Sequence, residues 1–134
     1  MGKTIAMVIG WVFLIVGILG FVPNPLVGED ALFHTDLNHN IVHLLSGIIF
    51  LWVAYKAPQK SAMVMKVFGV VYLLVAVLGF VMADGGSILG LIEINHADNW
   101  LHVLLGVVIL GAGIMAGKGS SAPVSNMGGG MGNM

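Results

Sequence analysis

Long apolar stretches alternate with short polar ones along this chain. Four stretches, at about 4–22, 39–55, 63–83 and 98–117, consist mostly of aliphatic and aromatic residues. A hydrocarbon core of about 30 Å needs about 20 helical residues, because an α-helix rises about 1.5 Å per residue. Each stretch comes close to this length. The pattern therefore predicts an all-α membrane protein with four transmembrane helices.

Composition supports this class. Of the 134 residues, 58% are hydrophobic and only 8% are charged, whereas soluble domains carry about 25% charged residues. So few charges cannot cover a water-facing surface, so we expect the lipid bilayer to surround the protein. The net charge of −1 gives no electrostatic footprint for nucleic acid. The absence of cysteine excludes disulfides and thiolate metal sites.

The two halves of the chain repeat one another at a shift of 59 positions, without a gap. Residues 10–22 then lie over 69–81, and three polar or glycine pairs fall in the same register: Asn40 with Asn99, His43 with His102, and Gly47 with Gly106. Apolar residues match by chance, whereas polar and glycine matches in one register indicate a repeat. Repeat A (about 4–55) and repeat B (about 63–117) are each predicted to form a helical hairpin.

Two hairpins that each cross the membrane twice have the same orientation. We therefore predict a pseudo-two-fold axis along the membrane normal. Because the first apolar stretch has a partner in the repeat, we expect it to be a transmembrane helix and not a signal peptide. The outer loops, which begin with turn-forming residues and then become apolar again, are predicted to be short interfacial segments.

The basic residues indicate the orientation. All five fall at the N-terminus, in the middle loop or near the C-terminal end: Lys3, Lys56, Lys60, Lys66 and Lys118. The positive-inside rule then predicts a multi-pass protein of the cell (inner) membrane with both termini cytoplasmic. The transmembrane domain is predicted over 1–117. Residues 118–134, rich in Gly, Ser and Met, are predicted to be a disordered cytoplasmic tail.

A polar motif precedes the second and fourth apolar stretches, as DLNHNIVH at 36–43 and NHADNWLH at 95–102. Asp and Asn commonly cap helix N-termini, and residues at i, i+4 and i+7 share a helix face. A first interpretation is a structural polar clamp whose Asn and His side chains hydrogen-bond across helices, above glycine contacts. Its residues are Asp36, Asn40, His43, Asn95, Asn99 and His102.

A second interpretation counts metal ligands. His39 and His43 lie at i and i+4, and Asp98 and His102 occupy the equivalent positions in repeat B. Three imidazoles and a carboxylate form a plausible ligand set for zinc. A third interpretation makes His43 and His102 axial ligands of a haem. His34 and His96, in the outer loops, are expected to be solvated or interfacial.

These interpretations give different functions. Stripes of small residues along the first and third stretches favour a non-enzymatic scaffold or accessory subunit, with another membrane protein or a second copy as partner. A metal-binding module is the alternative, and a haem protein is a lesser one. No catalytic or cofactor-binding residue is predicted, so we do not expect an enzyme. The middles of the four stretches carry no ionisable residue, which argues against a transport path.

Four segments resemble a known family: GFVP ending at Pro23, HNIVHLLSG at 39–47, VYLLVAVLGF at 71–80 and NHADNWLHVLLG at 95–106. They are similar to small bacterial four-helix membrane proteins of the family of domain of unknown function 4383. The resemblance covers about 4–117 and leaves out the tail. It implies the same fold and topology, and no catalytic residues, because the family has no assigned activity.

Overall fold

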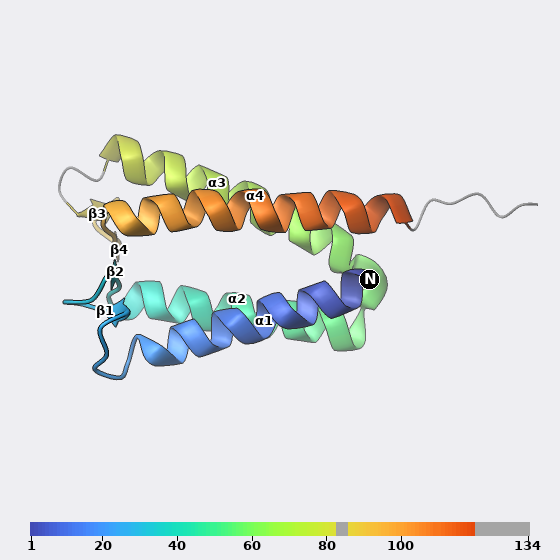
Figure 1. Cartoon of the computed structure of the whole chain (residues 1–134), viewed down its shortest axis with the longest axis horizontal. Helices are drawn as coiled ribbons and strands as arrows, with labels where there is room; N and C mark the ends of the chain where they lie inside the picture. Colours follow the sequence, from blue (N-terminus) through green and yellow to red (C-terminus); the bar gives the residue numbers. More distant parts are fainter. Residues whose placement is uncertain (83–85, 120–134) are drawn as a thin grey trace, which may run out of the picture.

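Four long helices make up most of the chain in a computed structural model, which describes residues 1–82 and 86–119 (Figure 1). They are α1 (Gly2–Leu19), α2 (Leu37–Lys56), α3 (Ser61–Met82) and α4 (His96–Gly119). A short 3-10 turn, η1 (Pro58–Lys60), joins α2 to α3. Each long helix is long and apolar enough to cross a membrane. The predicted all-α architecture with four membrane-spanning helices is therefore confirmed.

The helix ends lie one to three residues from the predicted ones, with the largest difference at the end of α1. The first stretch was expected to reach 22, but α1 ends at Leu19. The N–H groups of Phe21 and Val22 bond to carbonyls three residues back, and Pro23 disfavours helical backbone in the residue before it. At the other end, α4 includes Lys118 and Gly119, which were assigned to the tail. The remainder of the predicted tail, 120–134, lies outside the described residues.

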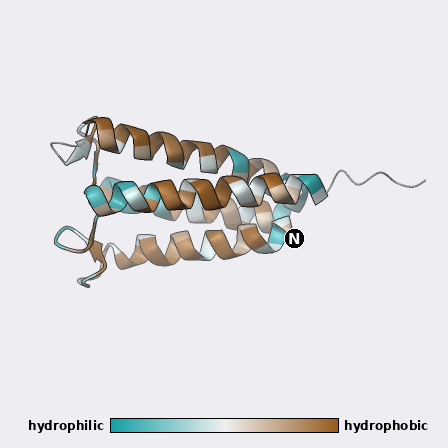
Figure 2. Ribbon diagram, turned by 45° about the horizontal axis from the view of Figure 1, so that its top comes forward, coloured by the Kyte–Doolittle hydropathy of each residue, from teal (hydrophilic) through white to brown (hydrophobic). Residues whose placement is uncertain are grey.

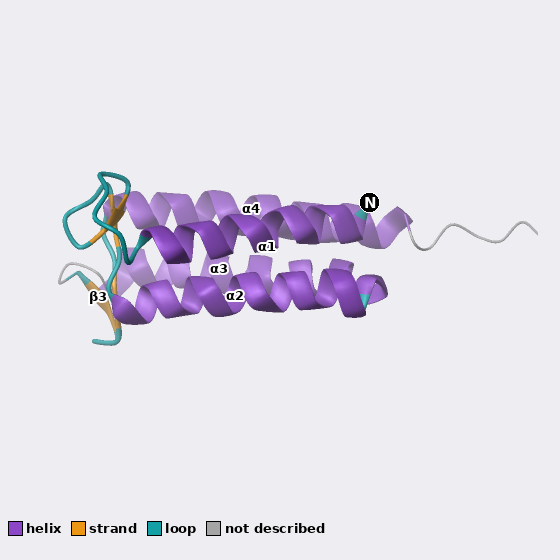
Figure 3. Ribbon diagram, turned by 90° about the horizontal axis from the view of Figure 1, so that it is seen from below, coloured by secondary structure: helices purple, strands orange, loops and turns teal. Residues whose placement is uncertain are grey.

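The helices pair as two hairpins, α1 with α2 and α3 with α4 (Figures 1 and 3). Glycines allow each close approach: a Cβ atom added at Gly10 would lie 2.8 Å from Leu51 Cγ. In the second hairpin a Cβ added at Gly69 would collide with Leu110. Both residues of this second contact lie 59 positions after those of the first. The packing inside the hairpins thus recurs at the shift seen in the sequence, while the two-fold axis itself remains a prediction.

Aromatic side chains fill the space between the hairpins. Phe13 stacks on Tyr72 with ring centroids 5.2 Å apart and on Phe50 at 6.0 Å, and Phe50 packs against Phe68 at 4.8 Å. The outward faces carry exposed Val, Leu, Ile and Trp side chains along the lengths of the helices. The hydropathy colouring of the ribbon shows that hydrophobic residues dominate the helices (Figure 2). Such a surface is suited to lipid.

The outer loops differ from the predicted simple segments because each contains a pair of two-residue strands. In the first loop β1 (Val27–Gly28) pairs in parallel with β2 (Phe33–His34). In the second loop β3 (Ser87–Ile88) pairs antiparallel with β4 (Ile92–Glu93). Strand β2 lies against α4, and β4 lies against α2. Each loop therefore crosses to the opposite hairpin, and both gather at the same end of the bundle (Figure 1).

Charges separate between the two ends of the bundle. The lysines fall in α1's first turn, at the end of α2, in η1, near the start of α3 and in α4's last turn. Those positions all lie at the end with the N-terminus and the α2–α3 connection (Figure 1). The described acidic residues lie at the loop end: Glu29, Asp30, Asp36, Glu93 and Asp98. Asp84 lies outside the described residues.

One side chain, that of Asn24, organises the loop after α1. Its Nδ2 atom lies within hydrogen-bonding distance of three carbonyl oxygens, those of Leu19 (2.9 Å), Val22 (2.7 Å) and Val27 (2.9 Å). Its Oδ1 atom accepts from the N–H groups of Leu26 and Val27, both at 2.9 Å. The side chain thus satisfies backbone groups on both sides of the turn, a role that the sequence analysis missed.

Replacing Asn24 tests this role. We expect Asn24→Ala to lower the free energy of unfolding by about 2 kcal/mol, because it leaves several backbone groups without their partner. Chemical denaturation in detergent micelles measures the change. Asn38→Ala is the matched control, since exposed Asn38 makes one bond, to the Leu91 carbonyl at 2.7 Å. A loss for Asn24→Ala no larger than that of the control would contradict the proposed role.

An ion pair joins the two loops. His34 Nε2 lies 2.7 Å from Glu93 Oε2, and both side chains are partly exposed. His34 was expected to be solvated or interfacial, and its contact with the second loop was not predicted. The hydrogen bond to the Glu93 carboxylate raises the pKa of His34 above its ordinary value of 6.5. These two positions, 34 and 93, are equivalent under the shift of 59.

The pair should respond to pH. Because the folded pKa of His34 is raised, its stabilising contribution is complete below the unfolded value of 6.5 and is lost as pH rises through the folded pKa. An NMR titration should place the His34 pKa above 6.5, and Glu93→Gln should lower it. The accompanying loss of stability at acidic pH should stay below about 1 kcal/mol, because the pair is partly exposed. An unchanged His34 titration in Glu93→Gln would rule out the ion pair.

Candidate functional site

The two polar motifs begin α2 and α4, as predicted. Asp36 Oδ1 accepts from the His39 N–H at 2.9 Å, and Asn95 Oδ1 accepts from the Asp98 N–H at 3.0 Å. The predicted N-caps are therefore confirmed. In α4 the bond is reciprocated, because Asp98 Oδ2 accepts from the Asn95 N–H at 2.8 Å. This arrangement is a capping box, with the shorter Asp98 where Glu or Gln is more usual.

Asp98 does not join the imidazoles with which it was predicted to bind zinc. Its Oδ2 atom also accepts from the His34 N–H of the first loop, at 2.9 Å. The buried carboxylate therefore bonds to backbone groups of both hairpins. Among the described residues, the potential metal ligands that lie close together are His39, His43 and His102. The ligand set is thus three histidines without the aspartate.

The histidine cluster, as we call His39, His43 and His102, is buried where the hairpins meet. His39 and His43 stand one turn apart on α2, and His102 comes from α4. Their exposed fractions are 3%, 4% and 3%. One ring nitrogen of each lies within 4.8 Å of the other two. The ring centroids are 4.8 to 6.4 Å apart.

Hydrogen bonding leaves the cluster incompletely satisfied. His39 Nδ1 lies 2.9 Å from the Glu93 carbonyl oxygen, and a carbonyl only accepts, so Nδ1 carries the proton and Nε2 keeps its lone pair. The buried Nδ1 atoms of His43 and His102 have no hydrogen-bond partner within the described ranges. Such unpaired polar atoms cost about 1–3 kcal/mol each. The cluster is therefore suited to a bound species that supplies partners.

Aromatic rings support the cluster from the interior side. Phe13 stacks on His43, and Tyr72 packs against His102, with ring centroids 5.5 Å apart in both pairs. Phe13 and Tyr72 are equivalent under the shift of 59, as are the two histidines that they touch. The sequence analysis assigned neither aromatic residue a role. Their shared place in the repeat, one helix away from the polar motif, was the available signal.

A cavity of about 160 Å³ adjoins the cluster between α2 and α3. Its polar lining residues are the three histidines, Ser46 and Tyr72. Its apolar lining residues are Val42, Phe68, Val71, Val75 and Ile92. Cofactor pockets measure about 300–1,000 Å³. The cavity is too small for a macrocycle, so the geometry does not fit the haem interpretation.

Asn40 and Asn99, the remaining clamp residues, pack against glycines. Asn40 Oδ1 occupies the place of a Cβ atom at Gly20, and Asn99 Oδ1 does the same at Gly79. Neither Oδ1 atom has a hydrogen-bond partner in the described part of the chain. The clamp was expected to hydrogen-bond across helices. The structure gives these acceptors a close steric fit across helices instead.

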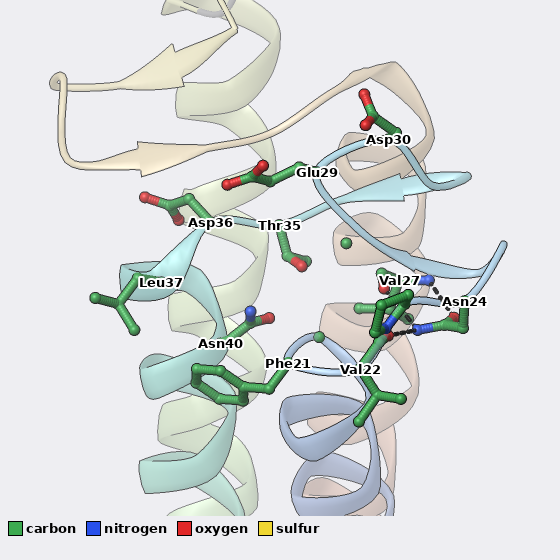
Figure 4. Close-up of a pocket in the computed structure, with 13 residues that line it drawn as sticks. Phe21, Val22, Asn24, Val27, Glu29, Asp30, Thr35, Asp36, Leu37 and Asn40 are labelled. Atoms are coloured by element: carbon green, nitrogen blue, oxygen red, sulfur yellow. Dashed lines mark hydrogen bonds between the residues drawn. The ribbon is translucent and has the colours of Figure 1, made fainter.

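A second hollow, of about 500 Å³, lies at the loop end of the first hairpin. Figure 4 shows Thr35 and Asn40 within it and the acidic residues around its edge, with the carboxylates of Glu29 and Asp30 directed to different sides. These acids do not form a group close enough to share a metal ion. The histidine cluster and its cavity are therefore the candidate functional site.

Comparison with known proteins places the chain in a family but gives it no activity. No curated protein and no solved structure matches it. The family described as "Domain of unknown function (DUF4383)" matches residues 3–115, a range that contains every residue of the histidine cluster and most of the four helices. Because this match covers well over half of the sequence, the chain belongs to the DUF4383 family.

Proposed function

We propose that this integral membrane protein binds a transition-metal ion through His39, His43 and His102. The observation that carries the proposal is a buried cluster of three imidazoles, two of which have an unpartnered ring nitrogen. Unsatisfied polar atoms at such depth are rare and commonly indicate a bound ion or water. Three imidazoles that converge from two helices favour an ion.

The spacing of the cluster is suited to a first-row metal. Three nitrogens bound to one zinc ion at about 2.0–2.1 Å lie about 3.3 Å apart. The ring nitrogens here lie within 4.8 Å of one another, so small side-chain rotations would close the set. His39 would offer Nε2, because its Nδ1–H is held by the Glu93 carbonyl. A backbone acceptor on the second ring nitrogen is the usual support of a metal-binding histidine.

The absence of Asp98 from the set affects the choice of metal. Three neutral imidazoles bring no negative charge, and burying an unbalanced charge is costly. Zinc with an anionic fourth ligand and monovalent copper both reduce that imbalance. Imidazole is suited to both metals. Three protein ligands would also leave one coordination position for water or another molecule.

The alternative function, a scaffold or accessory subunit, loses one of its supports. It was favoured by stripes of small residues along α1 and α3. Added Cβ atoms at Gly10 and Gly17 would collide with Leu51 and Leu44 of α2, within the same hairpin. The glycines that motivated an external partner are therefore used in internal packing. Co-purification of a larger complex from native membranes would restore the scaffold role.

Metal analysis tests the proposal. We expect about one zinc or copper ion per purified chain by mass spectrometry, and at least a tenfold loss in His43→Ala/His102→Ala, since one imidazole holds an ion poorly. His96→Ala, which removes an exposed histidine outside the cluster, is the matched control. Asp98→Asn should keep the metal, whereas a four-ligand site would lose it. Equal trace metal in wild type and double variant would overturn the proposal.

The orientation of the bundle is part of the same proposal. Lysines concentrate at the end that carries the N-terminus, the last turn of α4 and the α2–α3 connection, and the positive-inside rule makes this end cytoplasmic. In an inner membrane the loop end and the histidine cluster near it then face the periplasmic side. A metal would reach the cluster from that side.

Labelling of single-cysteine variants tests the orientation against a background free of native cysteine. A membrane-impermeant thiol reagent applied to intact cells should label Asp30→Cys and Ser87→Cys but not Lys60→Cys. Labelling of Lys60→Cys alone would reverse the orientation. Labelling of Asp30→Cys without labelling of Ser87→Cys would contradict the four-span arrangement.

A further inference from the structure

The cavity beside the histidine cluster is formed by faces of two helices from different hairpins. Four lining residues come from α2 and four from α3, and they recur every three or four positions, so they share one face of each helix. Ile92 of β4 and His102 of α4 complete the wall. Strand β4 covers the cavity at the outer end, because it lies against α2.

Two valines place an opening on the lipid-facing side. Val42 and Val71 line the cavity, yet their exposed fractions are 42% and 46%. Val71 stands close to the middle of α3 (Ser61–Met82), about 15 Å from either end at the rise of an α-helix. A side chain at that depth is exposed to acyl chains and not to water. The cavity therefore opens to the bilayer between α2 and α3.

The lining selects for an uncharged molecule with a polar atom. None of the lining residues carries a fixed charge. Tyr72 is 5% exposed, and its buried hydroxyl lies beside Ser46 but makes no hydrogen bond of good geometry within residues 1–82 and 86–119. Buried tyrosine hydroxyls usually have one. An oxygen atom on a ligand in the cavity would accept this bond.

Size and wall chemistry narrow the ligand to a single ring. An apolar cavity of about 150 Å³ in another protein stays dry and binds benzene, and this one measures about 160 Å³. Aromatic side chains form much of the wall: His43, Phe68, Tyr72 and His102. We infer that the cavity between α2 and α3 binds a small, uncharged, single-ring molecule bearing oxygen, of the phenol or quinone class, which enters from the bilayer and bonds to Tyr72. This site goes beyond the proposed function, because the ring needs no metal to bind.

Ligand-observed fluorine NMR in lipid nanodiscs tests the inference with 4-fluorophenol as probe, and protein-free nanodiscs correct for partition into lipid. We expect saturable binding to the wild type and at least tenfold weaker binding to Val71→Trp, which fills the opening. Val70→Trp is the matched control, since Val70 is 47% exposed but does not line the cavity. Charged 4-fluorobenzoate should not bind. Thermal unfolding checks that each variant folds, and Val75→Phe, at another lining position, replaces Val71→Trp if that variant does not.

A second comparison isolates the hydroxyl. Tyr72→Phe should weaken the binding of 4-fluorophenol by about three- to tenfold, the effect of one hydrogen bond, and should leave the binding of fluorobenzene unchanged. The ring site is overturned if 4-fluorophenol binds equally to the wild type, Val71→Trp and Val75→Phe, or equally to empty nanodiscs. The hydrogen bond to Tyr72 is overturned if Tyr72→Phe leaves the binding of 4-fluorophenol unchanged. The wild-type protein separates the two proposals, because its metal content and its binding of the ring are measured independently. A wild type without metal that still binds 4-fluorophenol saturably overturns the metal site alone, and a metal-loaded wild type that does not bind it overturns the ring site alone.

Discussion

Few polar contacts hold the two hairpins together, and the rest of the structure depends on them. Between transmembrane helices the hydrophobic effect gives little attraction, because lipid is as apolar as the helix surface. Several hydrogen bonds between the hairpins lie at the loop end: His34 N–H to Asp98, the His34 ring to the Glu93 carboxylate, His39 to the Glu93 carbonyl, Asn38 to Leu91, and Asn95 to Leu32. In a medium without competing water, each such bond also fixes register. They bring α2 and α4 close enough for the histidine cluster to form.

The helices and their caps could be predicted because they depend on local signals. Apolar runs of membrane-spanning length give the helices, and Asp36 and Asn95 are typical N-cap residues. The histidine cluster was partly predicted, since i and i+4 spacing and the repeat placed His39, His43 and His102 at one end of the bundle. What spacing could not show was the hydrogen bonding of Asp98. Its partner in the first loop is a backbone N–H group, and backbone groups leave no mark in the sequence.

The same reason explains the other omissions. Asn24 bonds to the backbone of its own loop, so no neighbouring residue type signals its role. Asn40 and Asn99 were assigned hydrogen bonds because an amide in a membrane normally needs them. The Gly20 and Gly79 positions are the better signal: a glycine facing an asparagine in both halves indicates a close steric fit. Pairing of residue types across the repeat was more informative here than the chemistry of one residue.

Positions 39 and 98 make corresponding contacts of opposite sense. His39 donates to the backbone of residue 93, whereas Asp98 accepts from the backbone of residue 34. Positions 39 and 98 are equivalent under the shift of 59, and so are positions 34 and 93. Two identical hairpins could not make this joint, because symmetry would place the same side chain on both sides. A single chain can differentiate them: one side keeps an imidazole available to a metal, while the other uses a carboxylate to join the hairpins. The asymmetry also disfavours pairs of like hairpins. Two copies of the first hairpin would set the His39 donor against the His34 N–H, and two copies of the second would set the Asp98 carboxylate against the Glu93 carbonyl. Covalent linkage of the two halves therefore gives this bundle a selectivity of assembly that a symmetric pair of hairpins would lack.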